Sequence, residues 1–264
     1  MQLRSCHTVV LKGTAHRHRQ WREDRSGRQT TKRGEAMATA RAFVFDAYGT
    51  LFDVHSVVNA LRAVTPEAEA VSQQWRQKQL EYSWLRALMG RYVDFWTVTD
   101  EALRFALRRY GLHLHPDQRA ALLNTYLRLS PYPEIPAMLE QLSPRPCAIL
   151  SNGSPSMLTA VVASSGLNGR FTHLLSADQV KVYKPDPRVY ALAPQALDMS
   201  KDAIVFVSSN AFDVMGAKAY GFQVVWVNRA QAPMDELNFA PDLVLTRLDE
   251  LPAAFQTNGV RHRT

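Results

Sequence analysis

The chain has 264 residues, of which 46% are hydrophobic, and its formal net charge at pH 7 is +7. This length and apolar content suffice for an α/β core with a second, smaller domain, whereas no apolar run approaches the roughly 18 residues that a membrane span requires. The two cysteines, Cys6 and Cys147, lie far apart, and the amino-terminal charges are not followed by an apolar signal segment. We therefore expect a reduced, cytoplasmic protein without a membrane partner.

The positive charge is concentrated in residues 1–39, which hold nine Lys or Arg residues against three Asp or Glu residues. This segment is polar and lacks apolar periodicity, so we expect a disordered basic leader. Trp21 is its only aromatic residue, and a segment with so little base-stacking capacity does not indicate a nucleic-acid partner. Met37 directly precedes the first predicted strand, which favours an upstream start site as the origin of the leader.

Residues 43–53 predict a buried strand that ends at a carboxylate. The apolar run Phe43-Val44-Phe45 stops at Asp46, and Gly49 and Thr50 follow closely. Open α/β sheets bind their ligands at the carboxyl ends of their strands. A carboxylate held there can act as a nucleophile that forms an ester with its substrate. The alternative is an Asp that only caps a turn.

A helical segment follows, over residues 54–133. Apolar residues spaced near 3.6 predict a helix over 67–89, ended by Gly90. The sequence Thr99-Asp100-Glu101 predicts the start of a second helix, which Gly111 ends. A third helix is expected over 116–129, before the prolines of 130–133. No strand-like alternation interrupts these helices, so we interpret 54–133 as an inserted helical cap domain.

Beyond residue 136, helices and strands alternate. Strands are predicted at 148–150, 173–176, 203–207 and 223–227, and helices at 155–164, 188–197 and 211–220. Such alternation is typical of a parallel sheet with helices on both faces. The core domain is therefore predicted to comprise residues 40–53 and 134–258, with a short tail at 259–264.

Four polar clusters follow the predicted strands. Each alone is compatible with an ordinary turn or helix start, but together they lie at one edge of the sheet. The clusters are Asp46 with Thr50, Ser151-Asn152-Gly153-Ser154, Lys184-Pro185-Asp186, and Ser208-Ser209-Asn210 with Asp213.

These clusters fit a single reaction. Lys184 can keep a nucleophilic carboxylate ionised and aligned. Hydroxyl and amide groups at Thr50, Ser151 and Asn152 can bind a substrate anion or a developing oxyanion. A second carboxylate, Asp213, can activate water to cleave an ester.

The motifs Asp-x-x-Gly-Thr-Leu-x-Asp, Ser-Asn-Gly, Lys-Pro and a strand-end Asp resemble the haloacid dehalogenase superfamily over nearly everything from residue 41 onward. Most members are Mg²⁺-dependent phosphatases, with a second Asp two residues after the nucleophile and a metal-ligating Asp in the fourth motif. Here these positions hold Tyr48 and Ser209. Mg²⁺ prefers hard oxygen ligands, typically carboxylates, so we predict no metal and no cofactor.

Tyr48 and Ser209 match the type II L-2-haloacid dehalogenases instead. The chain also resembles the signatures of that family in segments 46–58, 75–82, 182–186 and 207–213. The resemblance implies a Rossmann-like core with an inserted helical cap. It implies that Asp46 displaces halide from Cα of an L-2-haloalkanoic acid with inversion, while Arg76 on the cap faces the halide or the substrate anion. It also implies a homodimer that takes a small 2-halocarboxylate and releases halide.

The resemblance implies further site residues, carried over position by position. The remaining polar positions match Thr50, Ser151, Lys184, Tyr190, Ser208, Asn210 and Asp213. The substrate-binding positions match Ala47, Tyr48, Arg76, Gln77, Leu80, Phe95, Ser151, Asn152 and Phe212. Close relatives often have Trp where this chain has Phe212, which predicts a wider pocket.

Two other functions fit these residues less well than dehalogenation. A Mg²⁺-dependent phosphatase of the same superfamily is disfavoured by Tyr48 and Ser209. A catalytically silent binding protein is disfavoured by the intact set Asp46, Arg76, Lys184 and Asp213.

Overall fold

The computed structural model describes residues 40–255, so the predicted leader at 1–39 and tail at 259–264 lie outside the described residues. The described chain forms a six-stranded sheet in the order β3-β2-β1-β4-β5-β6. Every neighbouring pair of its strands is parallel. The strands are β1 (Ala42–Phe45), β2 (Cys147–Ser151), β3 (His173–Ser176), β4 (Ile204–Ser208), β5 (Gln223–Val227) and β6 (Leu243–Leu245).

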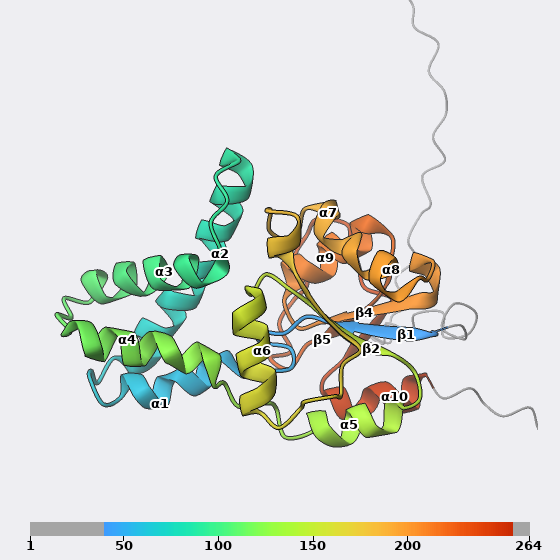
Figure 1. Ribbon diagram of the computed structural model, residues 1–264, viewed down its shortest axis with the longest axis horizontal. Coiled ribbons are helices and arrows are strands. Elements are labelled where there is room, and N and C mark those ends of the chain that lie inside the picture. The colour runs from blue at the N-terminus through green and yellow to red at the C-terminus, as the bar shows by residue number, and fades with distance from the viewer. Residues whose placement is uncertain (1–39, 256–264) are drawn as a thin grey trace, which may run out of the picture. The chain divides into compact units, whose positions relative to one another are not determined.

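Helices cover both faces of this sheet, with α5 and α10 on one side and α7, α8 and α9 on the other (Figure 1). Because both faces are covered, the central strands are buried along their whole length, as in β1 and β4. The helices of this part are α5 (Ile135–Leu142), α6 (Pro155–Ser164), α7 (Pro187–Tyr190), α8 (Leu192–Leu197), α9 (Ala211–Tyr220) and α10 (Leu251–Ala254).

The strand order reverses direction at β1. The chain runs from β1 to β2 and β3 on one side and then crosses to β4, which pairs with the other side of β1. In open α/β sheets such a switch point is where ligands bind. Asp46 follows β1 directly, beside the ends of β2 and β4.

The helices between β1 and α5 gather beside the sheet (Figure 1). Trp75 of α2 is fully buried, and its Nε1 donates to Thr99 O at 2.9 Å, which joins α2 to α3. No helix within residues 40–255 is long and apolar enough to cross a membrane. The helices are α1 (Val58–Leu61), α2 (Ala68–Met89), α3 (Phe95–Arg109) and α4 (Pro116–Asn124), with 3-10 turns at Val54–Val57 and Thr125–Leu127.

Two predicted helix boundaries in this part of the chain are wrong. The second helix begins at Phe95, not at Thr99, because the Asp94 carboxylate accepts from Thr97 N at 2.9 Å and provides the N-cap. Thr99 is therefore inside the helix and buried, and its Oγ1 donates to Phe95 O. The third helix ends at Asn124, five residues before its predicted end.

The helix predicted over 188–197 is divided into α7 and α8. Pro194 lacks the N–H that would donate to the carbonyl of Tyr190, so a continuous helix loses that hydrogen bond. Strand β6 and helices α5 and α10 were not predicted. Strand β6 has three residues, too few to show an alternating pattern.

The two chain segments that join the sheet to the helical segment pair with each other. Asp53 N donates to Ser130 O at 2.8 Å, and Tyr132 N donates to Leu51 O at 3.0 Å. An antiparallel bridge joins Phe52 to Pro131 between them. The outgoing and returning chains therefore form one paired linker, directly after the loop that carries Asp46.

Candidate active site

Asp46 is held by three side chains that donate to its carboxylate. Its Oδ1 accepts from Lys184 Nζ at 3.1 Å, and its Oδ2 accepts from Thr50 Oγ1 at 3.0 Å and from Asn210 Nδ2 at 2.8 Å. The residue is 6% exposed. Its N–H donates to Val207 O at 2.9 Å, which fixes the backbone against β4. The carboxylate is therefore oriented and largely removed from water.

Lys184 links this carboxylate to a second one. Its Nζ donates to Asp46, to Asp213 Oδ2 at 2.9 Å and to Leu150 O at 2.7 Å, so all three ammonium hydrogens have acceptors. Burial lowers the pKa of Lys184, but the carboxylates of Asp213 and Asp46 outweigh it, and the pKa lies above its usual value. The side chain remains an ammonium between two carboxylates.

Asp213 lies in the first turn of α9 and is fully buried. Burial raises the pKa of Asp213 to about 6; Lys184 opposes this rise and Asp46 adds to it. Its Oδ1 accepts from Tyr190 Oη at 2.8 Å. Burial and the nearby Asp213 charge raise the pKa of Tyr190 well above its usual value, so its hydroxyl remains a donor.

Arg76 on α2 reaches the sheet from the helical segment. Its NH2 group donates to Tyr48 O at 3.1 Å and to Asn210 Oδ1 at 3.4 Å. Asn210 also donates to Asp46, so the guanidinium lies one side chain away from the nucleophile candidate. Its NH1 group donates to Gln79 Oε1 at 2.6 Å, which holds it over this position.

The predicted hydroxyl and amide groups of the β2 and β4 loops lie close by. Ser151 Oγ accepts from Gly153 N at 3.1 Å, and Ser208 Oγ accepts from Asn210 N at 3.1 Å. Asn152 Oδ1 accepts from Lys184 N at 2.9 Å. Ser151, Asn152 and Ser208 are buried. These contacts fix the two loops around the Asp46–Lys184 pair.

Tyr48, a predicted substrate-binding residue, is 3% exposed. Its ring centroid lies 6.2 Å from that of Phe95 and 6.1 Å from that of Tyr126. A Cβ on Gly153 would lie 2.7 Å from this ring, so the close approach of the β2 loop requires glycine. Within residues 40–255, the Tyr48 hydroxyl has no hydrogen-bond partner, and burial raises its pKa.

The remaining predicted substrate-binding residues lie in varied environments. Phe212 is half-buried, and its ring centroid lies 5.2 Å from that of Trp84 of α2. Leu80 is half-buried and Gln77 is exposed. Ala47 is buried, and its carbonyl accepts from Leu51 N at 2.9 Å, which closes the turn after β1. The roles of these residues in binding stay predictions.

Two residues near the site were missed by the sequence analysis. Gln79 lies three positions after Arg76 on α2, a spacing that places two side chains on the same helix face. Arg229 follows β5 and donates to Ser209 Oγ at 2.8 Å. It lies just beyond the carboxyl end of a strand, so the criterion that identified the four polar clusters applies to it as well.

No group of three or more His, Cys, Asp or Glu side chains that could hold a metal ion occurs in the part of the chain that the structure describes. The residues that face Asp46 are instead an ammonium, a hydroxyl and an amide. The predicted independence from metals stays a prediction, which chelation can test.

The chain is similar to several dehalogenases. Residues 40–221 match the sequence pattern of a family described as haloacid dehalogenase-like hydrolase. The chain is 50% identical over 220 residues to an (S)-2-haloacid dehalogenase of Pseudomonas sp. (strain YL), covering 82% of this chain and 95% of that one. It is 44% identical over 218 residues to haloacetate dehalogenase H-2 of Moraxella sp. (strain B), covering 81% and 97%.

A solved structure gives the same likeness in three dimensions. It is the L-2-haloacid dehalogenase from Xanthobacter autotrophicus with chloropropionic acid covalently bound. The TM-score is 0.77 and the sequence identity is 46%, and the match covers 81% of this chain and 97% of that one.

Proposed function

Because this chain belongs to the haloacid dehalogenase-like hydrolases, we propose that it hydrolyses L-2-haloalkanoic acids to D-2-hydroxy acids and halide. The observation that carries this proposal is the ammonium of Lys184, which lies within hydrogen-bond distance of both Asp46 and Asp213. A nucleophile and a water-activating base are thereby held in one buried network. Both steps of a covalent hydrolysis can proceed there.

In the first step a carboxylate oxygen of Asp46 attacks Cα of the substrate and forms an ester bond. The carbon–halogen bond breaks, halide leaves with the bonding electrons, and the configuration at Cα inverts. Lys184, Thr50 and Asn210 orient the attacking group, so the reacting atoms start near the geometry of displacement. Arg76 places a positive charge next to Asn210, where it can attract the substrate carboxylate or the departing halide.

In the second step water attacks the carbonyl carbon of the Asp46 ester. Asp213 takes a proton from that water and returns it to the departing ester oxygen as the bond between this oxygen and the Asp46 carbonyl carbon breaks, which releases the 2-hydroxy acid. Because Cα is not touched in this step, the inverted configuration is kept. Tyr190 donates to Oδ1 of Asp213 and Lys184 to Oδ2, which fixes the orientation of this base.

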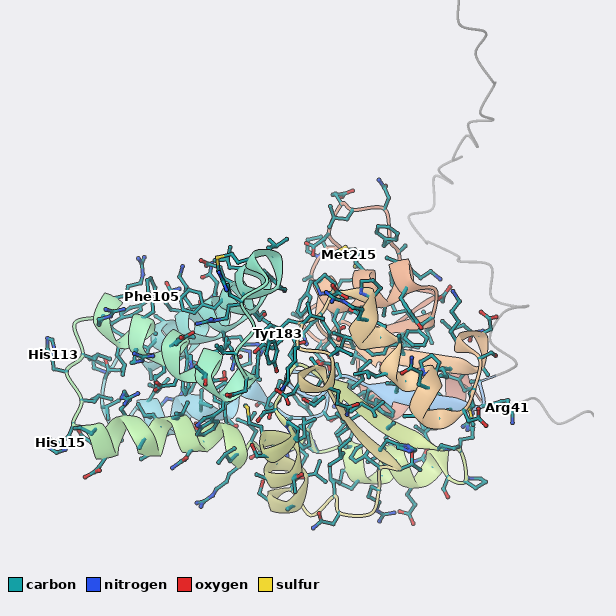
Figure 2. The ribbon with its side chains drawn as sticks, turned by 45° about the horizontal axis from the view of Figure 1, so that its top comes forward. Arg41, Phe105, His113, His115, Tyr183 and Met215 are labelled. Atoms are coloured by element: carbon teal, nitrogen blue, oxygen red, sulfur yellow. The ribbon has the colours of Figure 1, made fainter. Side chains whose placement is uncertain are left out.

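The helical segment 54–133 is proposed to act as the cap over this site. It supplies Arg76, and its Phe95 ring packs 6.2 Å from the ring of Tyr48. Tyr183, which precedes Lys184, lies where the helical segment meets the sheet (Figure 2). A cap that excludes bulk water strengthens the electrostatic interactions during displacement.

A cytoplasmic homodimer is proposed as the working form. The resemblance to the type II enzymes supports it, and Leu88 and Met89 at the end of α2 are 84% and 62% exposed. Apolar side chains grouped on a surface are typical of interaction sites. Sedimentation of the wild-type protein and of Leu88→Glu tests this point. If Leu88 lies in the dimer interface, the buried charge of the variant should dissociate the dimer.

The test of the function is halide release from each enantiomer of 2-chloropropionate, with and without EDTA. We expect release from the L enantiomer at an unchanged rate with EDTA, and a D-lactate product. Asp46→Asn should release no halide because an amide is a poor nucleophile. Phosphatase activity that requires added Mg²⁺, with no halide release, would contradict the proposal.

A further inference from the structure

Arg229 is a largely buried arginine that donates to the backbone of the Asp46 loop, at Gly49 O and Thr50 O. It comes two residues after β5, and its side chain is 21% exposed. Its neighbours come from three separate segments: the loop after β1, the loop after β4, and the linker that returns from the helical segment. Neither step of the proposed hydrolysis involves it.

The contacts of Arg229 with the two catalytic loops are all hydrogen bonds from its guanidinium. NH1 donates to Ser209 Oγ at 2.8 Å and to Gly49 O at 3.4 Å, and NH2 donates to Thr50 O at 3.1 Å. Ser209 N in turn donates to Thr50 Oγ1 at 2.9 Å, and Thr50 Oγ1 donates to Asp46 Oδ2 at 3.0 Å. Arg229, Ser209 and Thr50 are therefore joined in a closed ring of contacts, which the Thr50 hydroxyl connects to the nucleophile.

The guanidinium also contacts the linker that returns from the helical segment, at Glu134 and Tyr132. NH2 donates to Glu134 Oε1 at 3.1 Å, and the Glu134 side chain is 7% exposed. The guanidinium carbon lies 3.7 Å from the centroid of the Tyr132 ring. Stacking on an aromatic ring and a buried carboxylate partner together restrict the guanidinium to one plane.

We propose that Arg229 is a positioning residue for Asp46, acting through Ser209 and Thr50. The inference rests on the proposed function, since it concerns the orientation of the carboxylate that attacks Cα. Arg229 fixes the carbonyl of Thr50 directly and the hydroxyl of Thr50 through Ser209. The Thr50 hydroxyl accepts from Ser209 N and donates its own hydrogen to Asp46 Oδ2, which holds this oxygen in the attacking geometry.

The chemistry of the site requires arginine rather than a positive charge alone. Its planar guanidinium serves Ser209, Thr50 and Glu134 at once while it stacks on Tyr132. Lysine keeps the charge for Glu134, but its compact ammonium cannot stack and reach the same set of acceptors. Arg229→Lys therefore separates the positioning role from the ion pair.

The test compares Arg229→Lys with Arg145→Lys. Arg145 also donates to backbone carbonyls, of Leu142 and Phe255, and lies over an aromatic ring, that of Phe43 at 4.9 Å. It precedes β2 and so lies at the amino ends of the parallel strands, whereas Asp46 lies at their carboxyl ends. Both variants should have a lower melting temperature than the wild type, but only Arg229→Lys should have a lower rate of halide release.

The measurement is the rate of halide release from L-2-chloropropionate in a single turnover with enzyme in excess. For Arg229→Lys we expect a rate about 10- to 100-fold below wild type, as a displacement of the reacting atoms by about 1 Å produces. KM should stay within about twofold, because substrate binding does not involve this residue. Arg145→Lys should release halide at the wild-type rate.

A second comparison isolates the route through Ser209. If Arg229 acts through Ser209, the two substitutions interrupt the same route. The fold-loss in rate of the double variant should then be much smaller than the product of the fold-losses of Arg229→Lys and Ser209→Ala. Equal rates in Arg229→Lys and Arg145→Lys, or losses that multiply fully, would overturn the inference while leaving the proposed function intact. A wild-type protein that releases no halide from any 2-haloalkanoate would overturn the proposed function and this role with it.

Discussion

The Lys184 ammonium lies 2.9 Å from Asp213 Oδ2, and the two side chains are 1% and 0% exposed. A buried ion pair is costly to break, because removing one partner leaves the other charge without compensation. Lys184 also pairs with Asp46, so its removal would leave two carboxylates without a partner charge. The stability of the fold and the competence of the site therefore depend on one amino group.

Lys184→Met should abolish halide release and destabilise the protein by roughly 3–5 kcal/mol, the usual range for breaking a buried pair. Urea unfolding followed by circular dichroism gives the free energy of unfolding. Lys181→Met is the matched control, because the Lys181–Asp178 pair has a 63% exposed lysine and should contribute about 1 kcal/mol or less. Equal losses in the two variants would contradict a structural role for the buried pair.

Activity should decrease as the pH falls through about 6, the pKa to which burial raises Asp213. Only the ionised carboxylate can take a proton from water, so the ester should accumulate at acidic pH while the first halide is still released. The same shift has a consequence for stability. Because the folded protein binds this proton more tightly than the unfolded chain, the Asp213 contribution to stability is present below pH 4 and is lost as the pH rises through about 6.

Asp213→Asn provides the corresponding variant. It should release halide in a first turnover and then stop, leaving a covalent ester on the peptide that contains Asp46. Intact-protein mass spectrometry after addition of L-2-chloropropionate detects that adduct. Sustained turnover of Asp213→Asn at the wild-type rate would show that another group activates the water.

Phe212→Trp should narrow the pocket and shift the preference toward short substrates. Phe212 already contacts Trp84 at a centroid distance of 5.2 Å, so a larger ring has to occupy substrate space. One lost methylene contact changes kcat/KM by about 10- to 200-fold. We therefore expect kcat/KM for L-2-chlorobutyrate to fall by at least tenfold relative to L-2-chloropropionate. An unchanged ratio would exclude Phe212 from the wall that meets the substrate chain.

The fold was predictable because its signals are local. The alternation of helices and strands beyond residue 136 indicated a parallel sheet, and the sheet has that form. The strand that ends at Asp46 is the central strand β1, and the segment after it is helical, as expected. The resemblance to the dehalogenase family is likewise confirmed by the comparisons. The start of α3 was wrong because Thr99-Asp100-Glu101 resembles a cap, and only tertiary packing shows that Thr99 is buried.

The residues of the four polar clusters were predictable because they follow predicted strands. The contacts between side chains from distant segments were not predictable from the sequence. Residues at strand ends were brought together, and Asp46, Lys184 and Asp213 lie within hydrogen-bond distance along a single chain of contacts. Arg229 follows the carboxyl end of β5, where the same strand-end rule applied, but its role was missed because its hydrogen-bond partners lie in segments far apart in the sequence. The catalytic role of each residue stays a prediction until it is measured.

The most direct test of the covalent mechanism is a single turnover in ¹⁸O-water with enzyme in excess over L-2-chloropropionate. The route through Asp46 predicts a 2-hydroxy acid with an unlabelled hydroxyl oxygen and ¹⁸O in the Asp46 carboxylate, because water attacks the ester carbonyl. Mass spectrometry of the product and of the peptide that contains Asp46 locates the label. Label in the hydroxyl of the first-turnover product, with none in the peptide, would contradict the account, because water would then have displaced the halide directly.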